Sequence, residues 1–188
     1  LVHLQPRGFV EVQPESSFQG DTEWSFHQNL LQEVTYESVL KRERLSLHRV
    51  AAGWLERQAR QAGRLDEFAG LLGEHCERAG ELSAAADWYL QAGRRAMGQG
   101  APREAQGFYT QALELLPPVD RERRWQALLG REEALSVLGE AEPWRADITG
   151  LLELARSFDD DNALAEATLR QVRFGMSVDI PIAEQAAQ

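Results

Sequence analysis

The sequence predicts a mainly α protein in which antiparallel helical hairpins follow a short N-terminal β-hairpin. Apolar residues recur with a helical period from about residue 28 onward. Between residues 72 and 117 one pattern of small and aromatic residues is written twice, which is typical of stacked helical hairpins. The first 27 residues instead contain two short segments rich in strand formers, so a β-hairpin is expected there.

The expected β-hairpin is formed by residues 9–12 and 22–26. The segment 14–21 between them is polar and contains glycine, as hairpin loops do. Two strands alone are only marginally stable in water. We therefore expect the hairpin either to pack on the helices that follow or to be the remnant of a domain upstream.

Three helices are predicted to follow the hairpin. Two lie between residue 28 and about residue 61 and meet near Lys41. Gly63 separates them from a third helix that ends at Gly80, a suitable left-handed position after a helix. Cys76 lies on the apolar stripe of that third helix and is expected to be buried.

We assign residues 1–61 to a junction segment and residues 62–188 to helical repeats. Within the repeats, the later helices are separated by residues that stop or start helices. These are Gly98, Gly100, Pro102, Pro117, Pro118, Asp120, Gly139, Pro143 and the acidic run 159–162. Asp179 and Pro181 then predict the start of one more helix, so we interpret the chain as an array truncated at its C-terminus.

The repeated pattern matches the tetratricopeptide motif, in which small residues allow two helices to approach and aromatic residues fill the space beside them. An earlier copy is offset by 20 residues, which predicts that one helix is shared by two successive hairpins. Such hairpins stack in a right-handed superhelix. The residues expected to make the close contacts are Gly73, Ala85, Tyr89, Ala92, Gly93, Ala105, Tyr109, Ala112 and Pro117.

Composition and motifs exclude several classes of function. The formal net charge of −10 disfavours a broad nucleic-acid surface. There is no phosphate-binding loop, nucleophile elbow or zinc-binding pair of cysteines, so we expect no catalytic residue, metal or cofactor. The run 159–162 lacks the spacing of a calcium loop and is interpreted as a turn. No apolar run reaches the ~20 residues that span a bilayer, and we expect a cytoplasmic protein with no membrane partner.

The histidines and one basic cluster of the sequence were examined for a possible functional role. Each histidine, including His27 and His75, is expected to have a structural role. One basic cluster has three possible uses: intramolecular salt bridges or a domain junction, an acidic protein partner, or nucleic acid. This cluster consists of Lys41, Arg42, Arg44, His48 and Arg49.

Residues 24–48 contain a recognisable succession: W-S-F-H at 24–27, L-Q-E-V-T-Y-E-S-V-L at 31–40, Arg44 and the pair Leu47-His48. This succession resembles a segment of large bacterial signalling ATPases of the STAND class. The similarity continues through residues 74–80 and 85–93 into the repeats. In the family this segment follows the ATPase module, and Asn29 stands here where alanine is usual. Many members carry a nucleotide cyclase domain before the ATPase and a tetratricopeptide array after it.

The resemblance implies that the β-hairpin is the wing of a winged-helix element and that the helices form a non-catalytic interaction or sensor arm of a cyclase-linked signalling ATPase. The alternative is the inducer-binding repeat region of a LuxR-like transcription activator, and a third hypothesis is direct DNA contact by the hairpin and basic cluster. Expected partners are a protein or peptide, the upstream ATPase module, or a second copy through the truncated end. Candidate partner-binding residues are Glu74, Arg78, Asp87, Gln91, Arg94 and Arg95.

Overall fold

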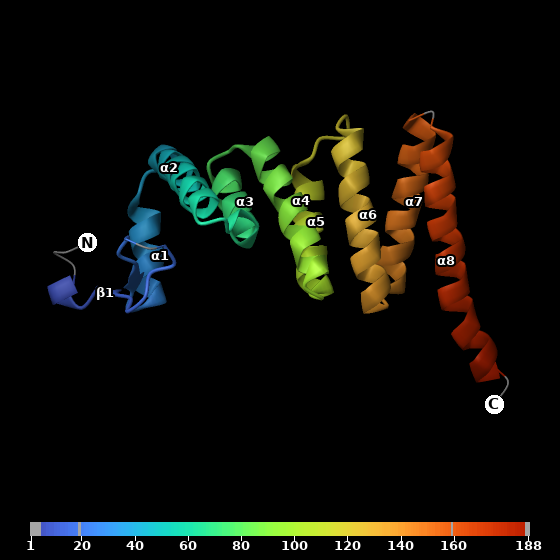
Figure 1. Cartoon of the computed structure of the whole chain (residues 1–188), viewed down its shortest axis with the longest axis horizontal. Helices are drawn as coiled ribbons and strands as arrows, with labels where there is room; N and C mark the ends of the chain where they lie inside the picture. Colours follow the sequence, from blue (N-terminus) through green and yellow to red (C-terminus); the bar gives the residue numbers. More distant parts are fainter. Residues whose placement is uncertain (1–4, 19, 159, 187–188) are drawn as a thin grey trace. The chain divides into compact units, whose positions relative to one another are not determined.

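The computed structural model describes residues 5–18, 20–158 and 160–186, which form a mainly α protein with a short β-hairpin at its N-terminal end (Figure 1). The chain divides into two compact units, Leu1–Glu81 and Leu82–Gln188. This division lies 20 residues beyond the expected boundary after residue 61. The reason is that the helix before that boundary packs on the helix after it, so both belong to the first unit.

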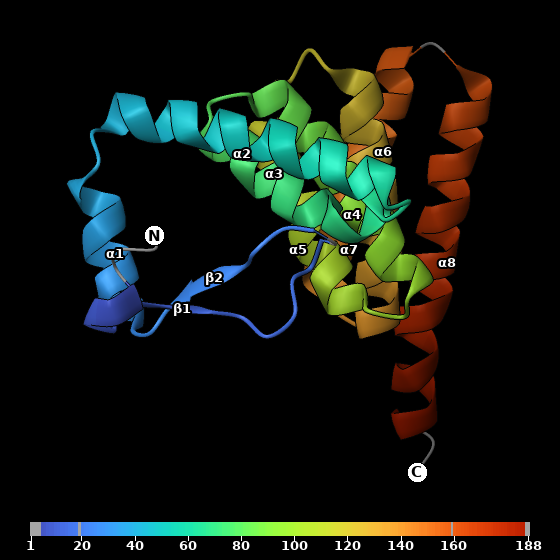
Figure 2. The same cartoon turned by 60° about the vertical axis from the view of Figure 1, so that its left-hand side comes forward.

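The β-hairpin begins the first unit, after a 3-10 turn, η1 (Gln5–Arg7). Its strands, β1 (Val10–Val12) and β2 (Trp24–Phe26), pair antiparallel with Val10 opposite Phe26 (Figure 2). Both fall inside the segments that the sequence predicted. The alternation of the strands places Val10 inward, where it is almost fully buried.

The loop of the hairpin packs on the helices of the same unit. Phe18 is buried, with its ring 5.3 Å from the ring of Trp54 and 4.9 Å from that of Phe68, measured between centroids. The guanidinium of Arg64 donates a hydrogen bond to the carbonyl oxygen of Ser17 at 3.0 Å. Of the two alternatives for the hairpin, the structure shows the first, packing on the following helices.

The helices of the first unit are α1 (Asn29–Ser38), α2 (Lys41–Gln61), a 3-10 segment η2 (Leu65–Phe68) and α3 (Ala69–Arg78). The core between α2 and α3 comes from one stripe on each helix. These stripes are His48, Ala52, Leu55 and Ala59 on α2, and Ala69, Leu72, Gly73 and Cys76 on α3.

Two predicted features of the first unit are confirmed at α3. Gly80 has a φ of +79°, and the amide of Glu81 donates to the carbonyl oxygen of Cys76 at 2.9 Å, which ends the helix as predicted. Cys76 is buried, and burial raises the pKa of its thiol.

The second unit is a series of antiparallel helices, each packed on the next (Figure 1). They are α4 (Leu82–Gly98), α5 (Pro102–Leu115), α6 (Arg121–Leu138), α7 (Ala141–Phe158) and α8 (Asp161–Ala186). Their ends follow the predicted signals. Pro102 opens α5, the carboxylate of Asp120 accepts a hydrogen bond from the amide of Arg123 at 3.3 Å, and Gly139 ends α6 with a φ of 70°.

Tyr109 of α5 packs against two glycines on neighbouring helices. A Cβ atom added to Gly93 on α4 would lie 2.7 Å from its ring, and one added to Gly130 on α6 would lie 2.2 Å from it. The ring is nearly inaccessible, and burial raises the pKa of Tyr109 to about 12. The absence of two side chains therefore lets α4, α5 and α6 approach closely around one aromatic ring.

Most residues named for repeat packing are buried, as the motif requires. They are Gly73, Ala85, Tyr89, Ala92, Gly93, Ala105, Tyr109 and Ala112. Pro117 is the exception, because it is exposed in the turn after α5. Its inclusion among the buried packing residues was wrong: its place is in the turn, where it prevents continuation of the helix. The packing of residues 69–79 on residues 82–97, which belong to different units, stays a prediction.

The expected helix start at Asp179 and Pro181 is also wrong, because α8 runs without interruption from Asp161 to Ala186. Proline removes one main-chain donor, and here the helix extends on both sides of Pro181. At the other end of α8, the carboxylate of Asp160 accepts from the amide of Asn162 at 2.9 Å, in keeping with the predicted turn. Asp159 lies outside the described residues. Across the described part of the chain, no helix combines the length and apolarity needed to cross a membrane.

Candidate functional site

Arg123 joins the N-terminal ends of α4 and α6. Its guanidinium donates to the carboxylate of Asp120 at 2.8 Å, to that of Asp87 at 3.0 Å, and to the carbonyl and hydroxyl oxygens of Ser83 at 3.1 Å each. The hydrogen bond from Arg123 lowers the pKa of Asp120. Asp87 was predicted to bind a partner, and here it already holds an intramolecular ion pair while keeping much of its side chain exposed.

The other predicted partner-binding residues fall in both units. Glu74 and Arg78 are exposed on α3 and pair with each other at 3.6 Å. Arg94 is exposed on α4, where the spacing of residues 87, 91 and 94 places them on one helix face. Gln91 and Arg95 are half-buried. Within the second unit, the structure thus brings part of the predicted set together on α4 and adds Arg123 to it.

We expect Arg123→Ala to reduce the free energy of unfolding of the second unit by about 1 kcal/mol, since partly exposed charge networks contribute on this scale. Urea unfolding at low and high salt measures the effect. The difference between variant and wild type should shrink in high salt, because exposed charges are screened. Arg156→Ala, at an exposed position on α7, is the matched control and should change stability by less than about 0.5 kcal/mol. Equal losses for the two variants would contradict the role of Arg123.

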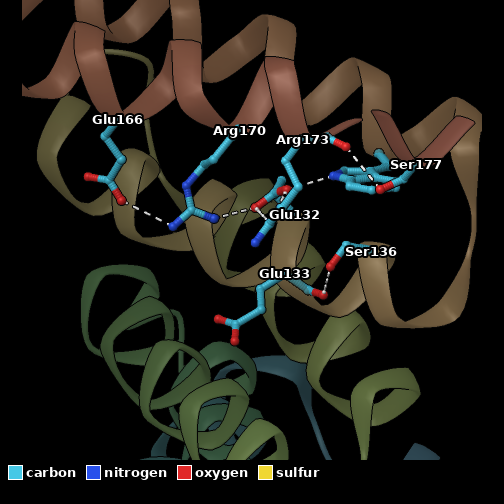
Figure 3. A network of polar contacts seen from close by, with 8 residues as sticks. Glu132, Glu133, Ser136, Glu166, Arg170, Arg173 and Ser177 are labelled. Carbon is cyan, nitrogen blue, oxygen red and sulfur yellow. Dashed lines mark hydrogen bonds and ion pairs between the residues drawn. The ribbon is translucent and has the colours of Figure 1, made fainter. Parts of the chain in front are cut away.

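Glu132 on α6 is fully buried and lies at the centre of a charged network with α7 and α8 (Figure 3). Its carboxylate accepts from the indole Nε1 of Trp144 at 2.6 Å and from the guanidinium of Arg173 at 2.8 Å, and it also pairs with Arg170. Arg170 pairs in turn with Glu166 at 3.0 Å. Carboxylate oxygens occupied by two guanidinium groups and an indole are poorly placed to take a proton from a substrate.

Reasoning from the sequence missed Glu132, although a signal was present. The apolar stripe of α6 contains Trp125, Leu128 and Leu135, and position 132 falls on the same stripe. A charge at such a position needs partners, because an unpaired buried charge is strongly unfavourable. Figure 3 shows Arg170 and Arg173 of α8 directed toward it.

The residue before Glu132 makes a second buried ion pair. Arg131 donates from two nitrogens to both carboxylate oxygens of Asp147 on α7, at 2.6 and 2.8 Å, and to the hydroxyl of Thr110 on α5 at 3.2 Å. Asp147 is buried. Two adjacent residues of α6, one positive and one negative, therefore form ion pairs with the neighbouring helices: Arg131 with α7 and Glu132 with α8. A bidentate pair also makes the geometry of the contact specific.

Three aromatic residues form a hydrogen-bonded chain in the first unit. The hydroxyl of Tyr36 on α1 lies 3.0 Å from Nε2 of His48 on α2, and Nδ1 of His48 lies 2.9 Å from Nδ1 of His75 on α3. Burial lowers the pKa of both histidines, and Arg78 lowers both further. From the sequence, these histidines were expected to have separate structural roles, because nothing local shows that residues 27 positions apart are in contact.

The basic cluster predicted near the start of α2 does not form one surface. His48 is buried in the chain just described, Arg44 stacks over the ring of Tyr36 with 4.9 Å to its centroid, and Arg49 pairs with Glu81 at 2.5 Å. Lys41 and Arg42 are exposed. Intramolecular contacts, the first of the three uses considered, therefore occupy most of the cluster.

Exposed apolar side chains mark a different surface of the first unit. On α1, whose residues are all at least partly accessible, Leu30 and Val34 are 65% and 59% exposed. On α2, Leu47 and Val50 are 59% and 65% exposed and lie on a different face from the buried stripe. Among residues 5–18, 20–158 and 160–186, no group of three or more histidine, cysteine, aspartate or glutamate side chains could hold a metal ion.

The fold and these clusters define a class: a mainly α protein of antiparallel helical hairpins with an N-terminal β-hairpin and buried charge pairs. No protein-family model matches the sequence, and no solved structure matches it. The chain is similar to an uncharacterised protein of Rhizobium meliloti (strain 1021), with 31% identity over 146 residues. The match covers 73% of this chain and 14% of that protein, so the chain spans a small part of its relative's length.

Proposed function

We propose that this chain is a non-catalytic docking arm of a multidomain bacterial signal-transduction ATPase, linked to a nucleotide cyclase and acting in the cytoplasm. The face that docks is defined as the exposed apolar residues of α1 and α2, Leu30, Val34, Leu47, Val50 and Trp54. The observation that carries the proposal is that no residue of α1 is buried.

Helix α1 has ten residues and none of them is buried. Isolated helices shorter than about 12–15 residues are marginal in water, and helices in proteins gain most of their stability by packing an apolar face. Leu30 and Val34, four residues apart, form such a face and leave it open. A surface that covers Leu30 and Val34 would supply the stability that α1 lacks by itself.

The apolar residues of α2 extend the docking face. Leu47, Val50 and Trp54 recur at helical spacing and remain exposed on α2. Exposed apolar side chains that gather on one face of a helix typically mark an interaction site. The two helices thus offer apolar stripes of the kind that pack on a neighbouring module.

The ATPase module is the proposed occupant because the docking face lies in and beside the segment that resembles signalling ATPases. That resemblance is carried by residues 24–48, and in the family this segment lies downstream of the ATPase module. The much greater length of the Rhizobium relative is in keeping with a multidomain parent. The second unit would then be the arm that presents α4 and its charged face, including Asp87 and Arg94, to a protein or peptide.

Site-specific photo-crosslinking in the producing cell tests the proposal. A benzophenone amino acid replaces Leu30 or Val50, and the matched control carries it at Gln126, an exposed polar position on α6. We expect crosslinks from positions 30 and 50 to a nucleotide-binding module, and few from position 126. Crosslinking at 30 and 50 no stronger than at 126 would contradict docking, and a captured module without a nucleotide site would contradict the ATPase assignment.

A further inference from the structure

We propose that Tyr36, His48 and His75 form an acid-sensitive latch, in which the contact between His48 on α2 and His75 on α3 stabilises the first unit at neutral pH and is lost when both histidines are protonated. The latch is defined by these three residues, all of which belong to the first unit. It consists of two consecutive hydrogen bonds, of 3.0 and 2.9 Å, that pass through the ring of His48.

The number of protons decides whether the latch closes. The two Nδ1 atoms face each other, so one must donate and the other must accept. With both rings neutral, a single proton lies between the two Nδ1 atoms. Nε2 of His48 then forms the other hydrogen bond with the hydroxyl of Tyr36. One extra proton on His48 still allows both bonds, because its two nitrogens then both donate. With both rings charged, two N–H groups would point at each other across 2.9 Å, and the central bond is lost.

The surroundings oppose the second proton. His48 is buried, and the guanidinium groups of Arg44 and Arg78 add positive potential at its ring. At His75, Arg78 acts in the same direction and Glu74 opposes it. Tyr36 faces the pair from α1, Arg44 from α2, and Glu74 and Arg78 from α3. The same two arginines disfavour a metal cation between the rings, so the pair is suited to protons.

The direction of the pH effect follows from the lowered pKa values. Both histidines have folded pKa values below their ordinary value of 6.5, so as the pH falls the unfolded chain takes up protons first. Stability of the first unit is therefore full above about pH 6.5 and declines below it. The decline ends only where the folded histidines are protonated as well.

Release of the latch would act first between α2 and α3, because the bond between the two Nδ1 atoms is the one that is lost. The hydroxyl of Tyr36 can still accept from Nε2 of a protonated His48, so the contact of α1 with α2 remains. Acid would thus loosen the contact of α3 with α2, the helix that carries Leu47 and Val50 of the docking face. This last step rests on the proposed function, whereas the latch itself does not.

The latch is tested on the purified chain by NMR titration of its histidine rings and by urea unfolding at pH 7.5 and 5.0. We expect His48 and His75 to titrate below pH 6.5, and the unfolding equilibrium constant of the first unit to rise by up to about tenfold per pH unit for each histidine. His75→Gln should remove most of this pH dependence. His27→Gln, at an exposed histidine paired with Glu11, should keep it.

The latch would be overturned if wild type and His75→Gln showed the same pH dependence, or if the two histidines were charged above pH 6.5. If His75→Gln does not fold, the wild-type titration decides. Tyr36→Phe, which keeps the histidine pair but lacks the hydroxyl, should loosen α1 at neutral pH and speed its amide hydrogen exchange. These measurements need no partner, so a failed crosslinking experiment and a failed latch are distinguishable.

Discussion

Replacing Glu132 with alanine is expected to reduce the free energy of unfolding of the second unit by about 4 kcal/mol, since removal of one partner from a buried ion network leaves the others uncompensated. The side chains left behind are the indole of Trp144 and the guanidinium groups of Arg170 and Arg173, the two arginines that Figure 3 shows beside Glu132. Urea unfolding measures the loss. It should be nearly independent of salt, in contrast to that of Arg123→Ala, because Glu132 is fully buried.

Glu133→Ala is the matched control, since Glu133 is the next residue of the same helix and is exposed. It should change stability by less than about 0.5 kcal/mol. Glu132→Gln should fall between the two, because the amide oxygen can still accept from Trp144 while the negative charge is gone. Similar stability of the Glu132 and Glu133 variants would show that the network is not buried in solution.

Gly130→Ala should destabilise the second unit by about 3 kcal/mol, at the upper end of the usual effect of overpacking. The new Cβ would lie 2.2 Å from Cζ of Tyr109, which is far inside contact distance. The ring cannot move freely, because Gly93 on α4 is also packed against it. The loss should appear as a lower urea midpoint with an unchanged slope.

Gly107→Ala controls for the effect of alanine on helix propensity. Gly107 lies on α5, and a Cβ there would meet no atom within 4 Å. Alanine favours helix by up to about 1 kcal/mol over glycine, so this variant should be as stable as wild type or more stable. Adding Tyr109→Leu to Gly130→Ala should recover part of the loss. A Gly130→Ala variant as stable as Gly107→Ala would contradict close packing of the ring.

The ends of most helices could be predicted from the sequence because their signals are local. Gly80 and Gly139 adopt the left-handed conformation that glycine permits, Pro102 opens a helix, and Asp120 caps one. Pro181 is an exception, since it lies within α8 although prolines elsewhere mark helix ends. A single proline therefore does not always end a helix, because it removes only one main-chain donor.

The candidate site was less predictable, because charged residues find partners that are distant in sequence. Asp87 was named as an exposed partner-binding residue, and its ion pair with Arg123 spans 36 positions. His48 and His75 were considered separately, and Glu132 was not considered at all, although it lies on an apolar stripe. Periodicity shows which face of a helix is buried, but not which helix covers it.

By itself, the sequence determined the mainly α class, the hairpin, most helix boundaries and the burial of the small residues around Tyr109, because turns, caps and helical periodicity are properties of neighbouring residues. Only the tertiary structure decided that Glu132 is neutralised by Arg170 and Arg173, and that His48 lies against His75. Those contacts join residues on different helices, and their energies depend on burial that exists only after the helices have packed.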